Sequence, residues 1–287
     1  MISRVVVLGG TGFLGRVAGS YARAAGLGVD LLGSKQVDLS KEGSLDAFHD
    51  RIDERTALLM AAAISRDAAD DDASLGLNLL MAQQVARFIR ERPPALLIYL
   101  SSVSVYGRSS SNLAITEETP VDLDSPYARA KHGGEEILRD CGVPTTLLRV
   151  CQVYGPSDTH HTYGPARFLD GIRKGRRVSL FGGGEELRDF LFEADFGRMI
   201  VRVVESKATG TFNLATGKSL RFAELVEQLK KVVPLPFEVI RVPRKVPLVH
   251  QGFEIAKLRE RFPGMTFTPL DEGLRETWAG RGVQGKS

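Results

Sequence analysis

The chain has 287 residues, of which 38 are Lys or Arg and 35 are Asp or Glu, so its formal net charge is +3, and 43% of the residues are hydrophobic. This balance excludes a disordered chain, because such chains hold few apolar residues and carry a high net charge. At roughly 150 residues per domain, the length predicts one large domain or two closely joined ones. The longest apolar runs fall short of the roughly 18 residues that a membrane-spanning helix needs, so no membrane helix is predicted.

The first residues, the cysteines and the charge pattern indicate the class of protein. Met1–Arg4 leads directly into an apolar run without the features of a secretory leader, so we expect a cytoplasmic protein. Cys141 and Cys151 stand beside apolar residues and outside any metal-ligand spacing, which predicts two buried thiols and no metal site. No basic run is interleaved with aromatic residues, so a small anionic ligand is a better candidate partner than nucleic acid.

Apolar, β-rich runs alternate with segments of helical periodicity over the first 150 residues. The predicted strands are Val5–Leu8, Val29–Leu32, Ala57–Ala63, Leu96–Leu100 and Thr145–Val150. The predicted helices between them include Ser74–Arg90 and Ser125–Arg139. This alternation predicts an α/β fold with a Rossmann-type, doubly wound parallel sheet that has helices on both faces. Val37–Leu39 is a candidate for a brief extra strand.

After Pro156 the sequence becomes richer in Gly, His and Pro, and its predicted elements are shorter. They include a helix over Arg221–Val232 and a buried strand over Thr211–Leu214 that can return to the main sheet. We therefore predict a main domain over residues 1–158, which also receives 189–215, and a smaller α/β region over 159–287. Residues 280–287 are expected to form a frayed tail.

A glycine-rich turn joins the first predicted strand to the first helix. Gly9-Gly10-Thr11-Gly12-Phe13-Leu14-Gly15 follows Val5–Leu8, and Arg16–Ala25 has a helical composition. Glycines let the backbone approach a pyrophosphate, whose negative charge is favoured by N–H groups at the start of the helix. A tight turn without a ligand also explains the glycines. The flanking strand and helix favour a dinucleotide site, which makes 1–158 the predicted dinucleotide-binding domain.

The end of the second strand bears on the choice of dinucleotide. Asp30 lies inside this strand, whereas the contact with the adenosine ribose belongs at its carboxyl end, where Gly33-Ser34-Lys35 stands. No carboxylate in this tripeptide repels a 2′-phosphate, and Ser34 and Lys35, helped by Arg16, can bind one. NADP(H) is therefore favoured and NAD(H) stays possible. Lys35 can also be an ordinary solvated lysine.

Tyr127 and Lys131 are spaced so that both side chains lie on one face of a helix. An ammonium next to a phenol lowers the pKa of the phenol, so Tyr127 can donate or remove a proton at a sugar hydroxyl or carbonyl. The same spacing is also common in pairs on a helix surface. Upstream, Ser101–Gly107 ends the strand Leu96–Leu100, and hydroxyls at the carboxyl end of a parallel strand are typical of ligand sites.

Four motifs, in this order and spacing, resemble the extended short-chain dehydrogenase/reductase family, the nucleotide-sugar epimerases, dehydratases and ketoreductases. They are the glycine turn, the Ser101–Gly107 strand end, the Tyr127–Lys131 pair and Arg149–Pro156. The resemblance continues in Asn78, in Leu180–Gly184 with Arg188–Phe190, and in Gly273-Leu274, so it covers nearly the whole chain.

The resemblance implies roles for individual residues. Ser102 would orient the substrate oxygen, Tyr127 would be the acid and base, and Lys131 would hold the ribose hydroxyls and tune Tyr127. The predicted cofactor-binding residues are Gly9, Thr11, Gly12, Phe13, Leu14, Gly15, Ser34, Lys35, Asp38, Leu39, Ala61, Ala62, Ala63, Asn78, Tyr127 and Lys131.

The predicted substrate contacts are Ser104, Gln152 and Arg188. Ser104 would contact the sugar, while Gln152 stands where the family usually has asparagine. Glu193 and Glu254 also depart from the family pattern, so the identity of the substrate stays open. Val103 and Ser104 replace the acidic pair that the dehydratases usually carry, so elimination between C5 and C6 is not expected.

Three charged features have structural explanations. Arg188 would bind the substrate diphosphate as a planar fork, but it can equally pair with Glu185 or Asp189. His160-His161 follows in a loop that can border the sugar, although a solvated loop is the favoured interpretation. Asp70–Asp72 precedes a helix and suits its positive N-terminus, and we assign it no catalytic role.

The leading hypothesis is an NADPH-dependent 4-ketoreductase of a nucleotide-linked 4-keto-6-deoxysugar. A 4-epimerase with retained NAD uses the same residues, and the motifs alone do not separate the two. A non-catalytic cofactor sensor or scaffold is a third hypothesis, which the combination of Ser102, Tyr127 and Lys131 disfavours. The resemblance also implies a homodimer formed through the helices at Leu79–Arg90 and Tyr127–Arg139.

Overall fold

The apolar runs of the first half of the chain form a parallel sheet in the computed structural model, which describes residues 1–159 and 164–280. Within these ranges, the sheet consists of β1 (Arg4–Leu8), β2 (Gly28–Leu32), β3 (Thr56–Met60), β4 (Leu96–Ser102), β5 (Thr145–Val150) and β10 (Gly210–Leu214). The strand order is β10-β5-β4-β3-β1-β2, and every neighbouring pair is parallel. The predicted doubly wound sheet is therefore confirmed, and the strand predicted at Thr211–Leu214 joins it beside β5.

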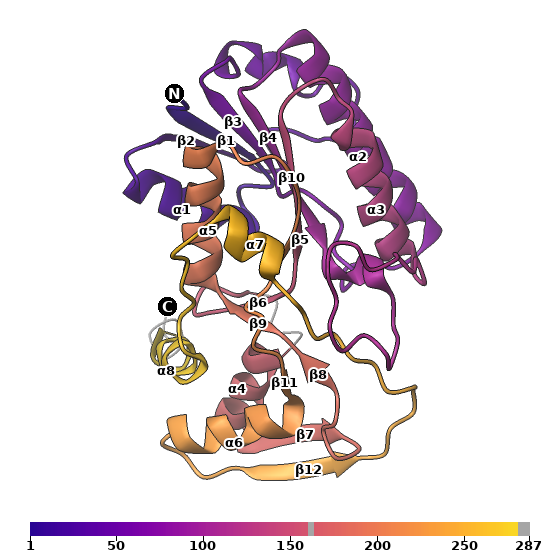
Figure 1. Ribbon diagram of the computed structural model, residues 1–287, viewed down its shortest axis with the longest axis vertical. Helices are drawn as coiled ribbons and strands as arrows, with labels where there is room; N and C mark the ends of the chain where they lie inside the picture. The colour runs from indigo at the N-terminus through magenta and orange to yellow at the C-terminus, as the bar shows by residue number, and fades with distance from the viewer. Residues whose placement is uncertain (160–163, 281–287) are drawn as a thin grey trace. The chain divides into compact units, whose positions relative to one another are not determined.

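Helices cover both faces of this sheet (Figure 1). They are α1 (Phe13–Ala24), α2 (Asp72–Glu91), α3 (Pro126–Arg139) and α5 (Glu193–Ser206), with short 3₁₀ helices at Asp46–Arg51 and Val103–Tyr106. One face carries α1 and α5, where Gly197 lets α5 approach the ring of Tyr21, and the other carries α2 and α3. All residues of β3 and β5 are buried, which explains why strands covered on both faces have nearly continuous apolar sequences.

The extra strand considered at Val37–Leu39 is wrong, because the chain turns there. The amide of Val37 donates to the carbonyl oxygen of Gly33 at 2.9 Å, which folds the segment back directly after β2. The carboxylate of Asp38 then accepts hydrogen bonds from the amide and hydroxyl of Ser40, at 3.2 and 2.6 Å. These local bonds satisfy polar groups that a strand would present to a neighbour, so the turn replaces the strand.

The described chain divides into two compact units. The first consists of Met1–Gly107, Pro120–Val150 and Phe196–Leu214, and the second of Arg108–Thr119, Cys151–Asp195 and the residues from Ala215 onward. The predicted loop residues His160-His161 and residues 281–287 of the expected tail lie outside the described residues. In the parts that are described, no helix combines the length and the apolar character needed to cross a membrane.

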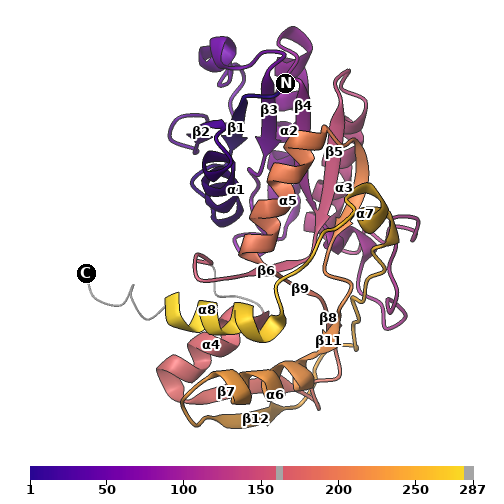
Figure 2. The ribbon, with the colours of Figure 1, turned by 60° about the vertical axis from the view of Figure 1, so that its left-hand side comes forward.

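The second unit is built from short strands and helices around a core of its own. Its elements are β6 (Gln152–Tyr154), α4 (Gly164–Gly175), β7 (Arg177–Phe181), β8 (Leu187–Arg188), β9 (Phe190–Phe192), β11 (Leu220–Arg221), α6 (Phe222–Val232), β12 (Glu238–Val242), α7 (Ala256–Arg261) and α8 (Leu270–Gly280). The strands pair as β6 with β9, β7 with β12 and β8 with β11. Figure 2 shows α4 and α6 beside β7 and β12, and apolar side chains of all four elements share one core.

A buried polar network joins helix α3 to the sheet of the first unit. The guanidinium of Arg149 on β5 donates to both carboxylate oxygens of Glu135 on α3, at 2.9 and 2.7 Å. Ser101 also donates to Glu135, while Arg149 donates to the Tyr106 hydroxyl at 2.9 Å. Tyr106 in turn donates to the side-chain oxygen of Asn213 at 2.7 Å. Because Ser101 and Asn213 flank Arg149 in register on the neighbouring strands, one charged pair ties together α3, β4, β5 and β10.

We expect Glu135→Gln to destabilise the fold, because it leaves the buried guanidinium of Arg149 without its counter-charge. Removal of one partner of a buried pair costs about 3 kcal/mol of the free energy of unfolding, to be measured by urea denaturation. The matched control is Glu136→Gln on the next residue, whose side chain is 63% exposed and contacts His132. The control should change stability by less than about 0.5 kcal/mol. Equal effects of the two substitutions would contradict a structural role for the buried pair.

Candidate active site

The glycine turn has the geometry of a phosphate cradle. Gly9 has a φ of +82°, and the amides of Gly9 and Gly10 both donate to the carbonyl oxygen of Leu32 at 2.9 Å. A Cβ atom at Gly9 would lie 2.6 Å from the backbone nitrogen of Ala62, so a side chain there is sterically excluded. Gly12 stands at the N-cap position before α1 and makes no side-chain cap, which leaves the positive end of the helix available to an anion.

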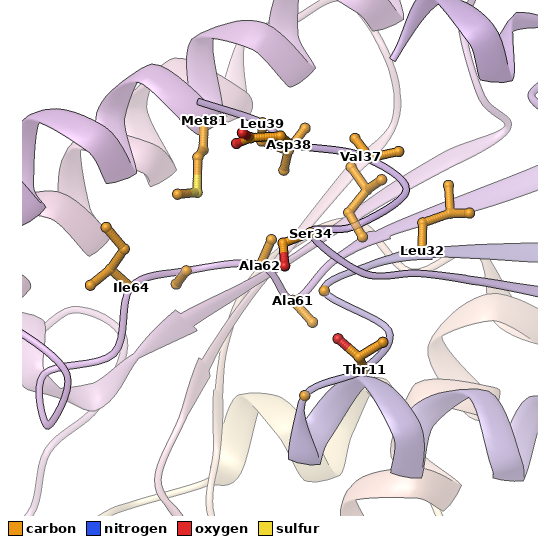
Figure 3. Close-up of a pocket in the computed structure, with 14 residues that line it drawn as sticks. Thr11, Leu32, Ser34, Val37, Asp38, Leu39, Ala61, Ala62, Ile64 and Met81 are labelled. Atoms are coloured by element: carbon orange, nitrogen blue, oxygen red, sulfur yellow. The ribbon is translucent and has the colours of Figure 1, made fainter. Parts of the chain in front are cut away.

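A cavity of about 330 Å³ lies at the carboxyl ends of β1, β2 and β3 (Figure 3). The predicted cofactor-binding residues in its lining are Gly9, Thr11, Gly12, Ser34, Asp38, Leu39, Ala61, Ala62 and Ala63. The lining also includes residues that the sequence analysis missed, namely Leu8, Leu32, Val37, Ile64 and Met81. Mostly apolar walls with a few polar groups, next to a phosphate cradle, suit the adenosine end of a dinucleotide.

Residues on α2 complete one wall of the cavity. The side-chain oxygen of Asn78 accepts the amide of Ile64 at 2.8 Å, and its nitrogen donates to the carbonyl oxygen of Ile64 at 3.1 Å. Asn78 itself is not in the lining; it fixes the backbone of a residue that is. Met81 stands one helical turn after Asn78 and points into the cavity (Figure 3). The i, i+3 spacing from Asn78 is the sequence signal that could have identified Met81.

The remaining residues predicted for the cofactor lie outside the cavity lining. They are Phe13, Leu14 and Gly15 in the first turn of α1, Lys35 on the exposed surface after β2, and Tyr127 and Lys131 on α3.

One carboxylate, that of Asp38, lies in the cavity lining, outside the tripeptide Gly33-Ser34-Lys35. Hydrogen bonds from Ser40 and the neighbouring ammonium of Lys41 lower the pKa of Asp38, so Asp38 is ionised at neutral pH. The Lys41 ammonium lies 3.3 Å from the carboxylate. The negative charge of Asp38 therefore has a local counter-charge, which reduces its repulsion of a phosphate.

The structure brings Tyr127 and Lys131 together on α3, next to the end of β4. The ammonium of Lys131 lies 5.8 Å from the centre of the Tyr127 ring and 5.1 Å from that of Tyr99. It is almost fully buried and donates a hydrogen bond to the carbonyl oxygen of Leu100 at 2.8 Å. Burial lowers the pKa of Lys131 to about 8, while the Glu135 carboxylate acts in the opposite direction. A cation is thus held beside the Tyr127 ring.

Ser102 and Ser104 lie where β4 ends and a 3₁₀ helix begins. The Ser102 hydroxyl accepts the amide of Ser104 at 3.1 Å and donates to the Ser104 hydroxyl at 3.1 Å. Ser102 thereby caps the Val103–Tyr106 helix, and both side chains are half-buried. Two linked hydroxyls at a strand end can orient an oxygen of a bound substrate.

The predicted substrate residues Gln152 and Arg188 belong to the second unit. Gln152 begins β6, and its side-chain oxygen is buried without a hydrogen-bond partner among the described residues. One nitrogen of Arg188 donates to the carbonyl oxygens of Leu187 and Val249, at 2.8 and 2.6 Å. The alternative partner Glu185 is paired with Arg244 instead, at 2.6 Å.

A second cavity, of about 310 Å³, lies in the second unit and is lined in part by Arg167, Lys174 and Arg177. Lys174 belongs to the last turn of α4, where cations offset the partial negative charge of the carbonyl end of a helix. This structural role accounts for Lys174, and we assign no ligand to the cavity.

Most of the chain matches the model of a known protein family. The model of the NAD dependent epimerase/dehydratase family matches residues 5–215, which is well over half of the chain. The chain belongs to this family. The match includes the glycine turn, the end of β4 and the Tyr127–Lys131 pair, so the resemblance inferred from these motifs is confirmed.

Similar proteins carry the names of different enzymes. The chain is 28% identical over 308 residues to the UDP-glucose 4-epimerase of Mycolicibacterium smegmatis, with coverage of 96% of this chain and 97% of that protein. It is 25% identical to the dTDP-6-deoxy-L-talose 4-dehydrogenase (NAD(P)(+)) of Kitasatospora kifunensis, with coverage of 96% and 95%. The structure of RMD from Pseudomonas aeruginosa complexed with NADPH has a TM-score of 0.85 at 22% identity, covers 98% of this chain and 99% of that chain, and shows the shared fold.

The lowered pKa of Lys131 predicts a pH-dependent stability. Below about pH 8 the folded and unfolded chains both hold the proton, and the full cost of burying the charge is present. Between about pH 8 and the ordinary value of 10.5, only the unfolded chain holds it, so the free energy of unfolding rises with pH. A shift of this size corresponds to about 3 kcal/mol.

We expect Lys131→Met to abolish this rise, as measured by urea denaturation between pH 7 and pH 10. The control is Lys231→Met, at an exposed position on α6, which should keep the rise of the unsubstituted protein. If Lys131→Met followed the same pH dependence as the control, the buried ammonium would not be its source.

Proposed function

We propose that the protein is an NADPH-dependent 4-ketoreductase that acts on a nucleotide-linked 4-keto-6-deoxysugar. The observation that carries this proposal is the carboxyl end of β2, where the chain reads Gly33-Ser34-Lys35 and turns at once. This strand end favours NADPH as the cofactor. A reductase consumes NADPH and releases NADP after every turnover.

Basic and hydroxyl groups favour a 2′-phosphate at this position. Ser34 lines the cavity, and the ammonium of the exposed Lys35 forms no ion pair with any described residue. Arg16 donates a hydrogen bond to the carbonyl oxygen of Thr11, which also lines the cavity. Gly33 packs against the Thr11 side chain, so the groups of both turns are neighbours. Lys35 and Arg16 supply the cationic partners that a phosphate monoester requires, and Ser34 supplies a hydroxyl.

The first unit carries the groups for proton transfer to a ketone. NADPH supplies the hydride when it is bound. Tyr127 donates the proton to the carbonyl oxygen, and the adjacent Lys131 ammonium stabilises the phenolate that remains. Ser102 orients the same oxygen by turning the O–H that it gives to Ser104 towards the substrate, and the Ser104 hydroxyl contacts the sugar. Lys131 uses one donor on Leu100 and has further N–H groups for the ribose hydroxyls of the cofactor.

The second unit is proposed to bind the nucleotide sugar. The buried side-chain oxygen of Gln152 can accept a hydrogen bond from a substrate hydroxyl, which would satisfy it. Arg188 is half-buried and has the planar fork that a diphosphate prefers. The names of the relatives support a nucleotide-linked sugar, since one is a UDP-glucose 4-epimerase and another acts on dTDP-6-deoxy-L-talose.

A 4-epimerase is the second candidate. It is favoured by the 28% identity to UDP-glucose 4-epimerase over nearly the full length of both chains. Tyr127, Lys131 and Ser102 would serve the same steps, but the NAD would stay bound, take a hydride from the sugar and return it within each cycle. The two functions therefore differ in whether the purified protein retains a nucleotide: the epimerase would retain NAD, and the reductase would retain little.

The first experiment is to denature the purified protein, identify any released nicotinamide nucleotide and then assay turnover. We expect little retained nucleotide, and consumption of NADPH with a dTDP- or GDP-linked 4-keto-6-deoxyhexose. Stoichiometric retained NAD together with interconversion of UDP-glucose and UDP-galactose would replace the reductase by the epimerase.

Tyr127→Phe should lower turnover at least roughly 100-fold while the Kd for NADPH changes less than about threefold, because the phenyl ring keeps the packing but has no proton to give.

Lys35→Ala tests the preference for NADP. We expect the Kd for NADPH, measured by fluorescence titration, to rise about tenfold, since one charge-assisted bond to the 2′-phosphate is lost, while the Kd for NADH changes less than about twofold. Lys231→Ala on the exposed face of α6 is the control for a general loss of positive charge. Equal weakening of both dinucleotides would refute a contact between Lys35 and the 2′-phosphate.

A further inference from the structure

Three consecutive aspartates at the start of α2 have three different partners. Asp71 caps α2, where its carboxylate accepts the amide of Ser74 at 2.8 Å. Asp72 begins α2 and pairs with Arg129 of α3 at 3.1 Å. Asp70 faces α3 instead and accepts the backbone amide of Tyr127 at 2.8 Å, across 57 residues of sequence. The expectation that all three serve the start of α2 is therefore wrong for Asp70.

The bond from Tyr127 completes the first turn of α3. A helix begins with amides that have no partner within the helix, and each needs an acceptor elsewhere. Pro126 has no N–H, and Ser125 accepts the amides of Ala128 and Arg129 through its hydroxyl and carbonyl oxygens, at 3.2 and 3.0 Å. The amide of Tyr127 is the donor that Ser125 does not serve. Asp70 supplies its acceptor, and the negative carboxylate also suits the positive end of the helix.

Asp70 is itself held in place. The guanidinium of Arg66 lies 3.5 Å from its second carboxylate oxygen. The backbone between them forms a turn in which the amides of Ala68 and Ala69 both donate to the carbonyl oxygen of Ser65, at 3.0 and 3.1 Å. Both side chains are partly exposed, at 37% for Arg66 and 26% for Asp70, so the pair is a surface feature and not part of the core. Substitutions here therefore leave the packing of the unit intact.

We propose that Asp70 is a positioning residue for Tyr127, which holds the backbone of the proton-donating residue so that its phenol meets the substrate carbonyl. This inference rests on the proposed function for its catalytic part. The bonded nitrogen of Tyr127 is one covalent bond from the Cα atom that carries the side chain, so the carboxylate fixes the point from which the phenol extends. Small displacements of a reacting group cost large factors in rate.

The same segment also borders the proposed cofactor site. Ala61, Ala62, Ala63 and Ile64 line the cavity, and Asn78 anchors Ile64. Asp70 follows Ile64 by six residues and reaches the catalytic helix. One continuous stretch of chain thus contacts the dinucleotide cavity at its beginning and the first turn of α3 at its end.

Asp70→Ala, Asp70→Asn and the control Asp72→Ala test the proposal in the full-length protein. Amide hydrogen exchange in the first turn of α3 reports the bond independently of activity, and we expect about tenfold faster exchange in Asp70→Ala. Turnover is measured with NADPH and the most active 4-keto-6-deoxyhexose nucleotide. We expect kcat to fall roughly tenfold while KM and the Kd for NADPH change less than about twofold, because the substrate contacts remain. Asp70→Asn keeps an acceptor oxygen and should restore both readouts, and Asp72→Ala should alter neither.

Several results would overturn the proposal. Unchanged exchange in Asp70→Ala would show that the carboxylate does not hold the first turn. Faster exchange with an unchanged kcat would show that the bond does not position Tyr127 for catalysis. Equal losses in Asp70→Asn and Asp70→Ala would assign the effect to charge and not to the hydrogen bond. If the unsubstituted protein turns over none of the sugars, the proposed function fails, while the exchange data still decide whether Asp70 holds the helix.

Discussion

The buried ion pair between Glu135 and Arg149 determines where helix α3 lies on the sheet. A guanidinium and a carboxylate that share two hydrogen bonds have one preferred geometry. Separating the two groups would leave a buried charge without a partner, which strongly destabilises the fold. Glu135 lies one helical turn after Lys131 and two turns after Tyr127. When the pair fixes Glu135 against β5, it also fixes the register of the two residues that carry the proposed chemistry. The first turn of α3 is tied separately, through Ser125 and Asp70.

Much of this arrangement can be predicted because its signals are local. Strands of a parallel sheet are buried on both faces, so they appear as continuous apolar runs, and the five predicted runs up to Val150 each contain a strand. The run Ala57–Ala63 is too long, because β3 ends at Met60 and Ala61–Ala63 line the cavity instead. The glycine turn and the Tyr127–Lys131 pair depend on short spacings within one turn or one helix. The carboxyl ends of neighbouring parallel strands meet at one edge, so the motifs that follow β1 and β4 are expected at the same edge of the sheet. The roles assigned to single residues there stay predictions.

The remaining features depend on contacts between distant parts of the chain, which no local pattern encodes. Glu135 and Arg149 are an ordinary helix glutamate and an unusual strand arginine until the sheet brings them together. The bond between Asp70 and Tyr127 spans 57 residues, and an aspartate before a helix is more simply interpreted as its cap. Val37–Leu39 failed as a strand for another reason. Its alternation of apolar and polar residues fits a strand, but the Asp38 carboxylate bonds to its own neighbours and stabilises a turn.

The burial of Lys131 has two opposite effects on its support of the Tyr127 phenolate. It strengthens the interaction of the charged ammonium, and it also favours the neutral amine. A low dielectric strengthens the interaction between the ammonium and the Tyr127 phenolate, so a buried lysine is more effective than a solvated one. The same burial lowers the pKa of Lys131 to about 8, and a neutral amine would give the phenolate no support. The Glu135 carboxylate opposes this shift, and a pKa of about 8 leaves most of the lysine protonated at neutral pH. Glu135 thus serves twice: with Arg149 it anchors the helix, and its charge raises the pKa of Lys131 against the effect of burial.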